Sequence, residues 1–358
     1  MSKVHNFSAG PGILPEEVLK QAAEACINFD NLNLSLLEIS HRSKNYEKVI
    51  LEARNTVKEL FEVGDEYEVL YLGGGASLQF AMIPYNLMRA DGGSAAYVNT
   101  GVWASKAIKE AKIIGDTKVI ASSEDKKFTY VPKGYEIPKD ADYLHITSNN
   151  TIYGTQMKEF PKSPIPVVCD MSSDIFSRKV DAKQFDIIYA GAQKNMGPAG
   201  STMVMVKKEA LGKTGRKMLS MLDYQVHIKG DSMYNTPPVF PIYVTLLTLQ
   251  WLKKNGGIAW IEKVNQQKAD AIYNEIDRNS LFYGTTAVED RSNMNVCFLM
   301  KKPELEAEFD KFWKDANISG IRGHRDVGGY RASLYNALPL ESVTVLVEVM
   351  KEFEKKFA

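Results

Sequence analysis

The sequence predicts an α/β protein with a mostly parallel sheet covered by helices on both faces, followed by a smaller α+β C-terminal domain. Short apolar runs alternate with helical patterns from Val69 to Val206, and such alternation is typical of parallel sheets. A chain of 358 residues is long for one hydrophobic core, and the helix cap at Asn255-Gly256-Gly257 marks a boundary. We therefore expect an N-terminal arm over residues 1–15, a large domain over 16–257 and a small domain over 258–358.

The first predicted elements follow from turn residues and helical spacing. A turn-rich arm, Asn6 to Gly12, precedes Pro15, which is suited to the first position of a helix. The stretch Leu36 to Ser40 is expected to be extended. A second helix, about Tyr46 to Phe61, has apolar residues on one face: Val49, Ile50, Ala53, Val57 and Leu60.

A glycine-rich turn follows the predicted strand Val69 to Leu72. The glycines of residues 73–75 let the backbone approach a ligand closely, and Ser77 is the expected cap of a helix over Leu78 to Met88. Backbone amides at a helix N-terminus form an anion site. The same pattern also fits a plain strand-to-helix turn, and it contains no GxGxxG for a dinucleotide.

Three more strands are predicted before the centre of the chain, over residues 95–99, 118–121 and 143–147. Trp103 lies near the start of the helix after the first of them, and Thr151 lies in the loop after the last. On the sequence alone, Trp103 is a core aromatic and Thr151 an ordinary loop hydroxyl.

One lysine and one aspartate indicate the chemistry. Asp170 ends a predicted buried strand, Pro166 to Asp170, and Lys194 lies on a tight turn between the apolar runs Ile187 to Ala190 and Ser201 to Val206. An isolated loop lysine is usually solvated, but a partly desolvated amine is suited to forming a Schiff base. A lysine Schiff base with an aspartate for the pyridinium nitrogen is the signature of pyridoxal phosphate (PLP) enzymes.

The candidate ligand residues have a common position. All of them fall at or just after the ends of apolar runs: Ser77, Trp103, Thr151, Asp170 and Lys194. Open α/β sheets bind ligands at the carboxyl ends of their strands, so we expect these side chains to lie close together.

The C-terminal part is predicted from helical periods and one good cap. Leu211 to Pro241 is long and irregular, and a helix from Val244 to Lys254 ends at Asn255-Gly256-Gly257. The elements expected beyond it are a helix over 260–277, a strand over 295–300, a helix over 304–313, a strand over 330–335 and a closing helix over 340–357.

Composition limits the partners and the compartment. Lys+Arg and Asp+Glu are both 44, so the zero net charge does not favour nucleic acid or an anionic membrane as partner. Cys26, Cys169 and Cys297 show no metal-ligand spacing, and this odd number suggests reduced thiols in a cytoplasmic protein. Neither the first residues nor the apolar stretch Val244 to Leu252 has the pattern of a secretory signal or a membrane span.

Five segments together resemble one known family. Ala190 to Gly200 closely resembles the PLP-lysine segment of the phosphoserine aminotransferases. Further matches follow in the expected order along the chain, at residues 6–11, 39–42, 235–238 and 323–333. The resemblance implies a fold-type I PLP enzyme that transfers the amino group between glutamate and 3-phosphohydroxypyruvate, giving O-phosphoserine and 2-oxoglutarate. It also implies a homodimer with shared active sites and a second role in pyridoxine biosynthesis through 4-phosphohydroxythreonine.

The resemblance assigns roles toward the cofactor. Lys194 would bind PLP and move protons, Asp170 would pair with the pyridine nitrogen, and Trp103 would stack on the ring. Thr151 would lie near the phenolic oxygen. The phosphate contacts implied are Ala76, Ser77 and Gln193, with Asn235 and Thr236 donated by the second subunit.

The resemblance also assigns roles toward the substrate. Arg331 would grip the α-carboxylate, since arginine binds carboxylates bidentately. The distal phosphate or side-chain carboxylate would be bound by His324 and Arg325, together with His41 and Arg42 of the partner subunit. Some members of the family have arginine where this chain has Ser77. This chain therefore lacks one of the cations expected near the substrate phosphate.

Other functions fit parts of the same pattern. Another fold-type I aminotransferase, such as an alanine–glyoxylate aminotransferase, would not need the two His-Arg pairs. A cysteine desulfurase would need a cysteine on a mobile loop, whereas Cys169 lies inside a predicted strand. A non-catalytic binding protein on the same fold would not need both Lys194 and Asp170.

Overall fold

The computed structural model describes residues 4–358, so the first three residues of the expected arm lie outside the described part. Its main feature is a sheet in which only one strand, β10, runs antiparallel to its neighbours, so the predicted mostly parallel sheet is confirmed. In spatial order the strands are β2 (Tyr67–Leu72), β10 (Thr202–Lys207), β9 (Ile187–Gly191), β8 (Val167–Asp170), β5 (Tyr143–Thr147), β3 (Ser94–Asn99) and β4 (Asp116–Ser122).

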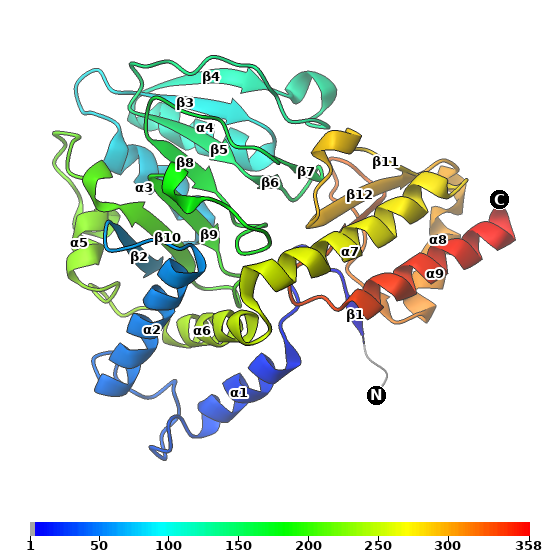
Figure 1. The fold of residues 1–358 in the computed structure, drawn as a ribbon, viewed down its shortest axis with the longest axis horizontal. Helices are drawn as coiled ribbons and strands as arrows, with labels where there is room; N and C mark the ends of the chain where they lie inside the picture. Colours follow the sequence, from blue (N-terminus) through cyan, green and yellow to red (C-terminus); the bar gives the residue numbers. More distant parts are fainter. Residues whose placement is uncertain (1–3) are drawn as a thin grey trace.

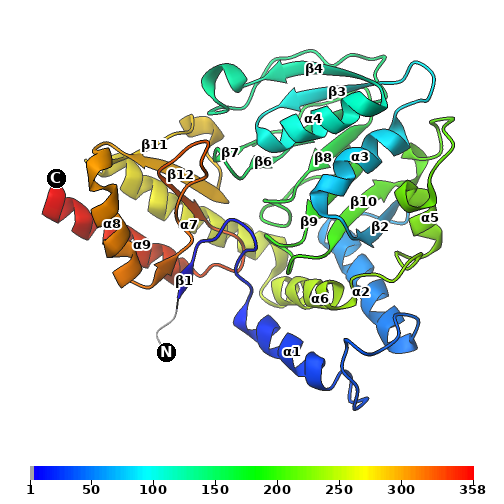
Figure 2. The ribbon, with the colours of Figure 1, turned by 180° about the vertical axis from the view of Figure 1, so that it is seen from behind.

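Helices cover both faces of this sheet, because alternate strand residues point to opposite sides. On one face, α2 (Lys44–Leu60) and α6 (Val239–Lys254) pack against Tyr71, Cys169 and Ile188. On the other face, Leu70, Tyr97, Val168 and Tyr189 pack against three helices, which lie in front of the sheet in Figure 2: α3 (Gly75–Leu87), α4 (Val102–Ile114) and α5 (Tyr224–Lys229). α1 (Glu16–Ile27) packs on α6 through Val18 and Ala22 and extends away from the sheet (Figure 1).

The C-terminal part has a second core around an antiparallel sheet (Figure 1). Its elements are α7 (Gly257–Arg278), β11 (Phe282–Gly284), β12 (Asn295–Met300), α8 (Glu306–Asp315), β13 (Ile318–Ser319), β14 (Tyr330–Ser333) and α9 (Leu340–Phe357). α7 contributes Ile261 to the first core and Ile272 to the second. The predicted domain boundary after residue 257 therefore falls at the start of a helix shared by both cores, and it stays a prediction.

Short elements complete the chain. β1 (His5–Asn6) pairs in parallel with β13, which ties the N-terminal arm to the C-terminal part. β6 (Asn149–Asn150) and β7 (Thr155–Gln156) form a small hairpin. The 3-10 helices are η1 (Glu124–Lys126), η2 (Ala182–Gln184), η3 (Lys208–Ala210), η4 (Ser220–Leu222), η5 (Val288–Asp290) and η6 (Pro303–Leu305). Within residues 4–358, no helix combines the length and apolarity needed to cross a bilayer.

Four local predictions were wrong. Leu36 to Ser40 is a turn and not an extended stretch, because the Ser35 side chain accepts from Leu37 N at 3.1 Å and the Ser35 carbonyl from Glu38 N at 3.0 Å. Pro15 is the cap of α1 and not its first helical residue.

The other two errors concern where helices begin. α3 starts at Gly75, so its cap is Gly74, with φ of 85°, and Ser77 lies inside the first turn. α6 starts at Val239, earlier than predicted, because Pro241 lies in the first turn, where a missing N–H costs no helical hydrogen bond.

Candidate active site

Two neighbouring strands position the predicted aspartate and lysine. Asp170 is the last residue of β8, and Lys194 lies three residues beyond the end of β9. Two backbone hydrogen bonds of Ala192 close the turn that holds Lys194: Ala192 N donates to Ser201 O at 3.0 Å, and Ala192 O accepts from Gly197 N at 2.8 Å. Both groups therefore lie at the carboxyl edge of the sheet.

Lys194 is partly buried and touches two of the predicted cofactor residues. Its Nζ donates to Thr151 Oγ1 at 2.8 Å and lies 5.7 Å from the centre of the Trp103 ring. Burial lowers the pKa of Lys194 to about 8, although Asp170 acts in the opposite direction. Near that pH a substantial fraction of the amine is neutral and able to act as a nucleophile or base.

Asp170 is buried, and burial raises the pKa of its carboxyl group. Hydrogen bonds from Ser172 oppose this rise, and so do Lys194 and the Tyr189 hydroxyl. Ser172 N donates to Asp170 Oδ1 at 2.9 Å, while Ser172 Oγ accepts from Gly191 N at 3.2 Å. The carboxylate is thus held by the first residues of the loop that follows its own strand.

Two connected hollows surround these groups. The inner hollow, about 130 Å³, and the outer hollow, about 580 Å³, share Trp103, Thr151, Gln193 and Lys194. The inner one is also lined by Ala76, Ser77 and Asp170. The clustering expected from strand ends is therefore confirmed, whereas the role of each residue stays a prediction.

The inner hollow fits PLP. The first amides of α3 have no partner within the helix, because the first intrahelical bond runs from Leu78 N to Gly74 O at 3.2 Å. A Cβ added at Gly75 would meet no atom within 4 Å, so open space lies beside this backbone. Trp103 Nε1 and Thr147 Oγ1 are buried without a hydrogen-bond partner in the described chain. The unpaired amides at the α3 N-terminus suit a phosphate, and the unpaired polar atoms of Trp103 and Thr147 suit a polar ring near Asp170.

The outer hollow contains the cations predicted for the substrate. Arg331, on β14, donates from Nη1 to Thr151 O at 3.3 Å, and its Nε is buried with no partner among residues 4–358. His324 Nδ1 lies 3.3 Å from Asp326 N and 3.5 Å from Asp326 Oδ2, so Asp326 orients the imidazole. The Arg325 side chain is 91% exposed, and its Nε lies 3.8 Å from Asp326 Oδ1.

Four predicted residues are not brought to this site within one chain. Asn235 and Thr236 line a separate hollow of about 440 Å³, beside Gly73 and Gly74. His41 and Arg42 lie in the turn before α2 and line neither the inner nor the outer hollow.

Lys106 and Ser172 are among the residues of the site that were not predicted from the sequence. Lys106 lines the outer hollow, with its Nζ 4.6 Å from the Trp103 ring centre. It follows Trp103 by three positions on a helix, which is the spacing of side chains on one face and was the available signal. Ser172 lies two residues after Asp170, where an aspartate commonly accepts from the backbone.

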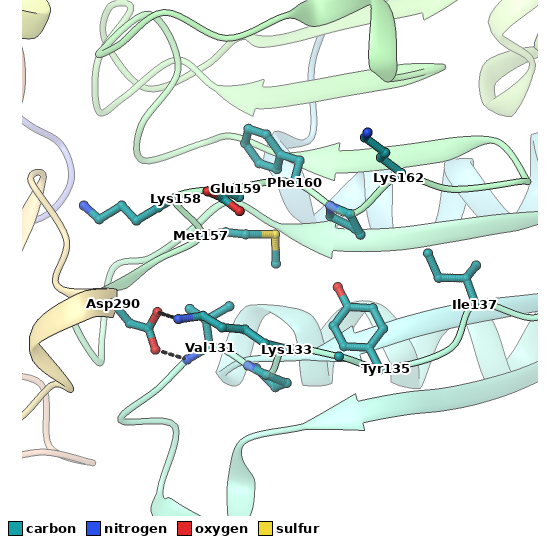
Figure 3. Close-up of a pocket in the computed structure, with 13 residues that line it drawn as sticks. Val131, Lys133, Tyr135, Ile137, Met157, Lys158, Glu159, Phe160, Lys162 and Asp290 are labelled. Atoms are coloured by element: carbon teal, nitrogen blue, oxygen red, sulfur yellow. Dashed lines mark hydrogen bonds and ion pairs between the residues drawn. The ribbon is translucent and has the colours of Figure 1, made fainter.

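A different hollow, about 500 Å³, lies between residues 131–137 and 157–162 (Figure 3). Asp290 accepts from Val131 N at 2.9 Å and pairs with Lys133 Nζ at 3.1 Å. Figure 3 shows Lys158 and Lys162 pointing away from each other, at opposite ends of the hollow. Its cations therefore do not converge, in contrast to those of the outer hollow.

Comparisons with known proteins agree with this geometry. The family model for class-V aminotransferases matches residues 4–346. The phosphoserine aminotransferase of Flavobacterium psychrophilum is 64% identical over 355 residues, covering 99% of both chains, and that of Flavobacterium johnsoniae is 62% identical over the same share.

Solved structures of the same family share the fold over nearly the whole chain. The phosphoserine aminotransferase of Bacillus circulans subsp. alkalophilus has a TM-score of 0.96 at 44% identity, covering 99% of both chains. The PLP-bound phosphoserine aminotransferase of Trichomonas vaginalis has a TM-score of 0.92 at 34% identity, covering 98% of this chain and 100% of the other. An alanine–glyoxylate aminotransferase from Nostoc, at 15% identity and a TM-score of 0.77, shares the fold. The chain therefore belongs to the phosphoserine aminotransferases, PLP-dependent enzymes of the class-V aminotransferase family.

Proposed function

We propose that this chain catalyses reversible amino transfer between glutamate and 3-phosphohydroxypyruvate, giving O-phosphoserine and 2-oxoglutarate. The observation that supports it most is the hollow in which a partly buried Lys194 lies beside Thr151 and near Asp170, with Arg331 and His324 at the open side. The high identity to relatives of that name supports the same reaction.

The residues of the inner hollow would hold the cofactor. When bound, PLP supplies an electrophilic carbonyl and a ring that accepts electrons. The α3 N-terminus at Ala76 and Ser77, with Gln193, would bind its phosphate. Trp103 would stack on the ring, and Asp170 would hold the proton on the ring nitrogen. A carboxylate is needed there, since an amide cannot stabilise that positive charge.

Lys194 would act as both the attachment point and the base. Its pKa of about 8 leaves much of the amine neutral under mildly alkaline conditions, so Nζ can accept a proton from the substrate Cα. Thr151 holds Nζ through its hydroxyl and keeps the amine on the Trp103 side of the site.

The outer hollow would recognise an amino acid with a second anionic group. Arg331 would grip the α-carboxylate, and His324 Nε2 and Arg325 would bind the distal phosphate or the glutamate side chain. 4-Phosphohydroxythreonine has the same α-carboxylate and terminal phosphate, so we propose it as a second substrate, with a role in pyridoxine biosynthesis.

We also propose a homodimer with shared sites. Asn235 and Thr236 would complete the phosphate site of the partner, while His41 and Arg42 would complete its substrate site. Support comes from the fact that none of the four lines the inner or outer hollow of its own chain. Exposed apolar side chains around α1 and η4 also support an interface: Leu32, Leu34, Leu37, Leu219 and Met221. With three free cysteines, two of them buried, we propose a cytoplasmic location.

The ionic role of Asp170 has a direct test. Asp170→Asn should retain bound PLP but lose about 10²-fold or more in kcat, because the neutral amide cannot hold the ring-nitrogen proton. Steady-state kinetics with phosphoserine and 2-oxoglutarate measure the loss. Near-normal kcat in this variant would mean that Asp170 has only a structural role.

The burial of Lys194 predicts a pH-dependent stability. Its pKa is about 8 in the folded chain against an ordinary value of 10.5, so between these pH values the unfolded chain binds more protons and stability rises with pH. Below pH 8 the buried ammonium costs at most about 3 kcal/mol. Lys194→Met should therefore stabilise the cofactor-free protein at pH 7 and lose this advantage toward pH 10. Urea unfolding at pH 7 and pH 10 measures the difference in free energy of unfolding between the parent and the variant, and Lys106→Met, at an exposed position, is the control. If Lys194→Met changed the stability equally at both pH values, the lowered pKa of Lys194 would be contradicted.

The shared site can be tested with hybrid dimers. Lys194→Ala and Arg42→Ala proteins should each have weak phosphoserine activity alone. If Arg42 acts across the interface, a mixed dimer has one site with both lesions and one with neither, so activity should return on mixing. Mass spectrometry of differently tagged subunits confirms the exchange. Verified exchange without recovered activity would show that Arg42 acts within its own subunit.

Arg42→Ala alone should also change specificity. Its KM for phosphoserine should rise about ten- to a hundred-fold, the range for one charge-assisted contact, while the KM for alanine should hardly change. Equal changes for both donors would contradict a role at the distal anion.

A further inference from the structure

A chain of polar side chains runs into the core behind Asp170. Asp170 of β8 is paired in register with Tyr189 of β9, so both side chains project to the same face of the sheet. The Tyr189 hydroxyl is near enough to Asp170 to lower the pKa of its carboxyl group. His145, two positions before the end of β5, places its Nε2 2.9 Å from that hydroxyl. All three side chains are at least 95% buried, so no solvent competes with these contacts.

The number of protons fixes the direction of the hydrogen bonds. A tyrosine hydroxyl has one proton, and a carboxylate can only accept. If Tyr189 donates to Asp170, then His145 must donate from Nε2 to Tyr189. The His145 Nδ1 then carries a lone pair, and in the described chain this buried atom has no partner. Burial lowers the pKa of His145 to about 3, so the ring is neutral and holds a single proton.

Neighbouring polar groups on the same face are paired among themselves. The Tyr97 and Tyr143 hydroxyls are 2.7 Å apart, and Tyr224 donates to Gln79 at 2.6 Å. The Tyr97 ring stacks on His145, with centroids 4.8 Å apart and planes 19° from parallel. Tyr97 therefore orients the imidazole without joining the hydrogen-bonded chain to Asp170.

We propose that Tyr189 and His145 are positioning residues for the amino-transfer reaction: His145 Nε2–H donates to Tyr189, and Tyr189 donates to Asp170, which keeps the carboxylate ionised and directed at the cofactor's ring nitrogen. The proposal rests on the proposed role of Asp170. A carboxylate removed from water is stabilised by donors that remain fixed in place, and the Tyr189–His145 pair supplies one from the side opposite the hollow.

A pair of matched variants tests the proposal. Tyr189→Phe and Tyr97→Phe each remove one hydroxyl from the same core. Tyr97→Phe leaves Tyr143 without its hydrogen bond, whereas Tyr189→Phe takes one away from His145 and, under the proposal, one from Asp170. Tyr189→Phe should retain PLP about ten-fold less tightly and lower kcat about ten-fold with KM for phosphoserine unchanged, since a hydrogen bond to a charged group is lost. Tyr97→Phe should stay within about two-fold of the parent in both.

A second measurement is independent of turnover. Nitrogen-15 NMR of histidine-labelled, cofactor-free protein should show His145 neutral, with its proton on Nε2, in the parent chain. A proton on Nδ1 would overturn the proposal, because Tyr189 would then donate to His145 and not to Asp170. Equal losses of PLP binding in the two phenylalanine variants would overturn it as well. If the parent protein binds PLP but lacks phosphoserine activity, the proposed reaction fails, while the PLP-binding and NMR results still decide the role of this pair.

Discussion

Asp170 and Lys194 are opposite charges at a buried edge of the sheet, and burial works against both. It raises the pKa of the carboxyl group and lowers the pKa of the amine, while each group partly offsets the shift of the other. Much of the local structure supplies donors that keep this pair in place. Ser172 donates to the carboxylate, and Thr151 accepts from the amine. An uncompensated charge at either position would be costly, so these neighbours are as much a part of the site as the pair itself.

The site is assembled from distant parts of the chain because the sheet and the C-terminal core meet there. β14 brings Arg331 to the carbonyl of Thr151, and the His324 turn lies over the same hollow. The pairing of β1 with β13 holds the N-terminal arm against the C-terminal part, and Gly10 and Pro11 of that arm line the outer hollow. Residues of the C-terminal part would therefore contact the anionic groups of the substrate, whereas residues at the edge of the large sheet would bind the cofactor.

Strand ends were predictable from the sequence, and so was the cluster they form. Asp170 and Lys194 follow apolar runs, and parallel strands bring such positions to one edge of the sheet. Helix starts were less predictable. Ser77 is a good cap by type, but Gly74 adopts a positive φ that no other residue accepts easily, so the helix begins earlier.

Contacts within the core could not be predicted at all. Tyr189 and His145 each lie in an apolar run, where a polar side chain looks like ordinary core, and only the register of β5, β8 and β9 brings them behind Asp170. The turn at Leu36 to Ser40 depends on the Ser35 side chain, which competes with extended backbone in a way that hydrophobic patterning does not reveal. Hydrophobic pattern and spacing within one chain do not show which residues act in a partner subunit, so those positions were assigned only from the resemblance to the family.

We propose that Lys194 is the amine to which PLP is attached. Borohydride reduces the C=N bond between PLP and a lysine to a stable amine, so reduction followed by peptide mapping identifies that lysine. We expect a yellow protein that loses its colour on reduction, with the cofactor on the peptide that contains Lys194. The Lys194→Ala protein should give no adduct. An adduct on any other lysine, or equal labelling of the Lys194→Ala protein, would contradict this assignment.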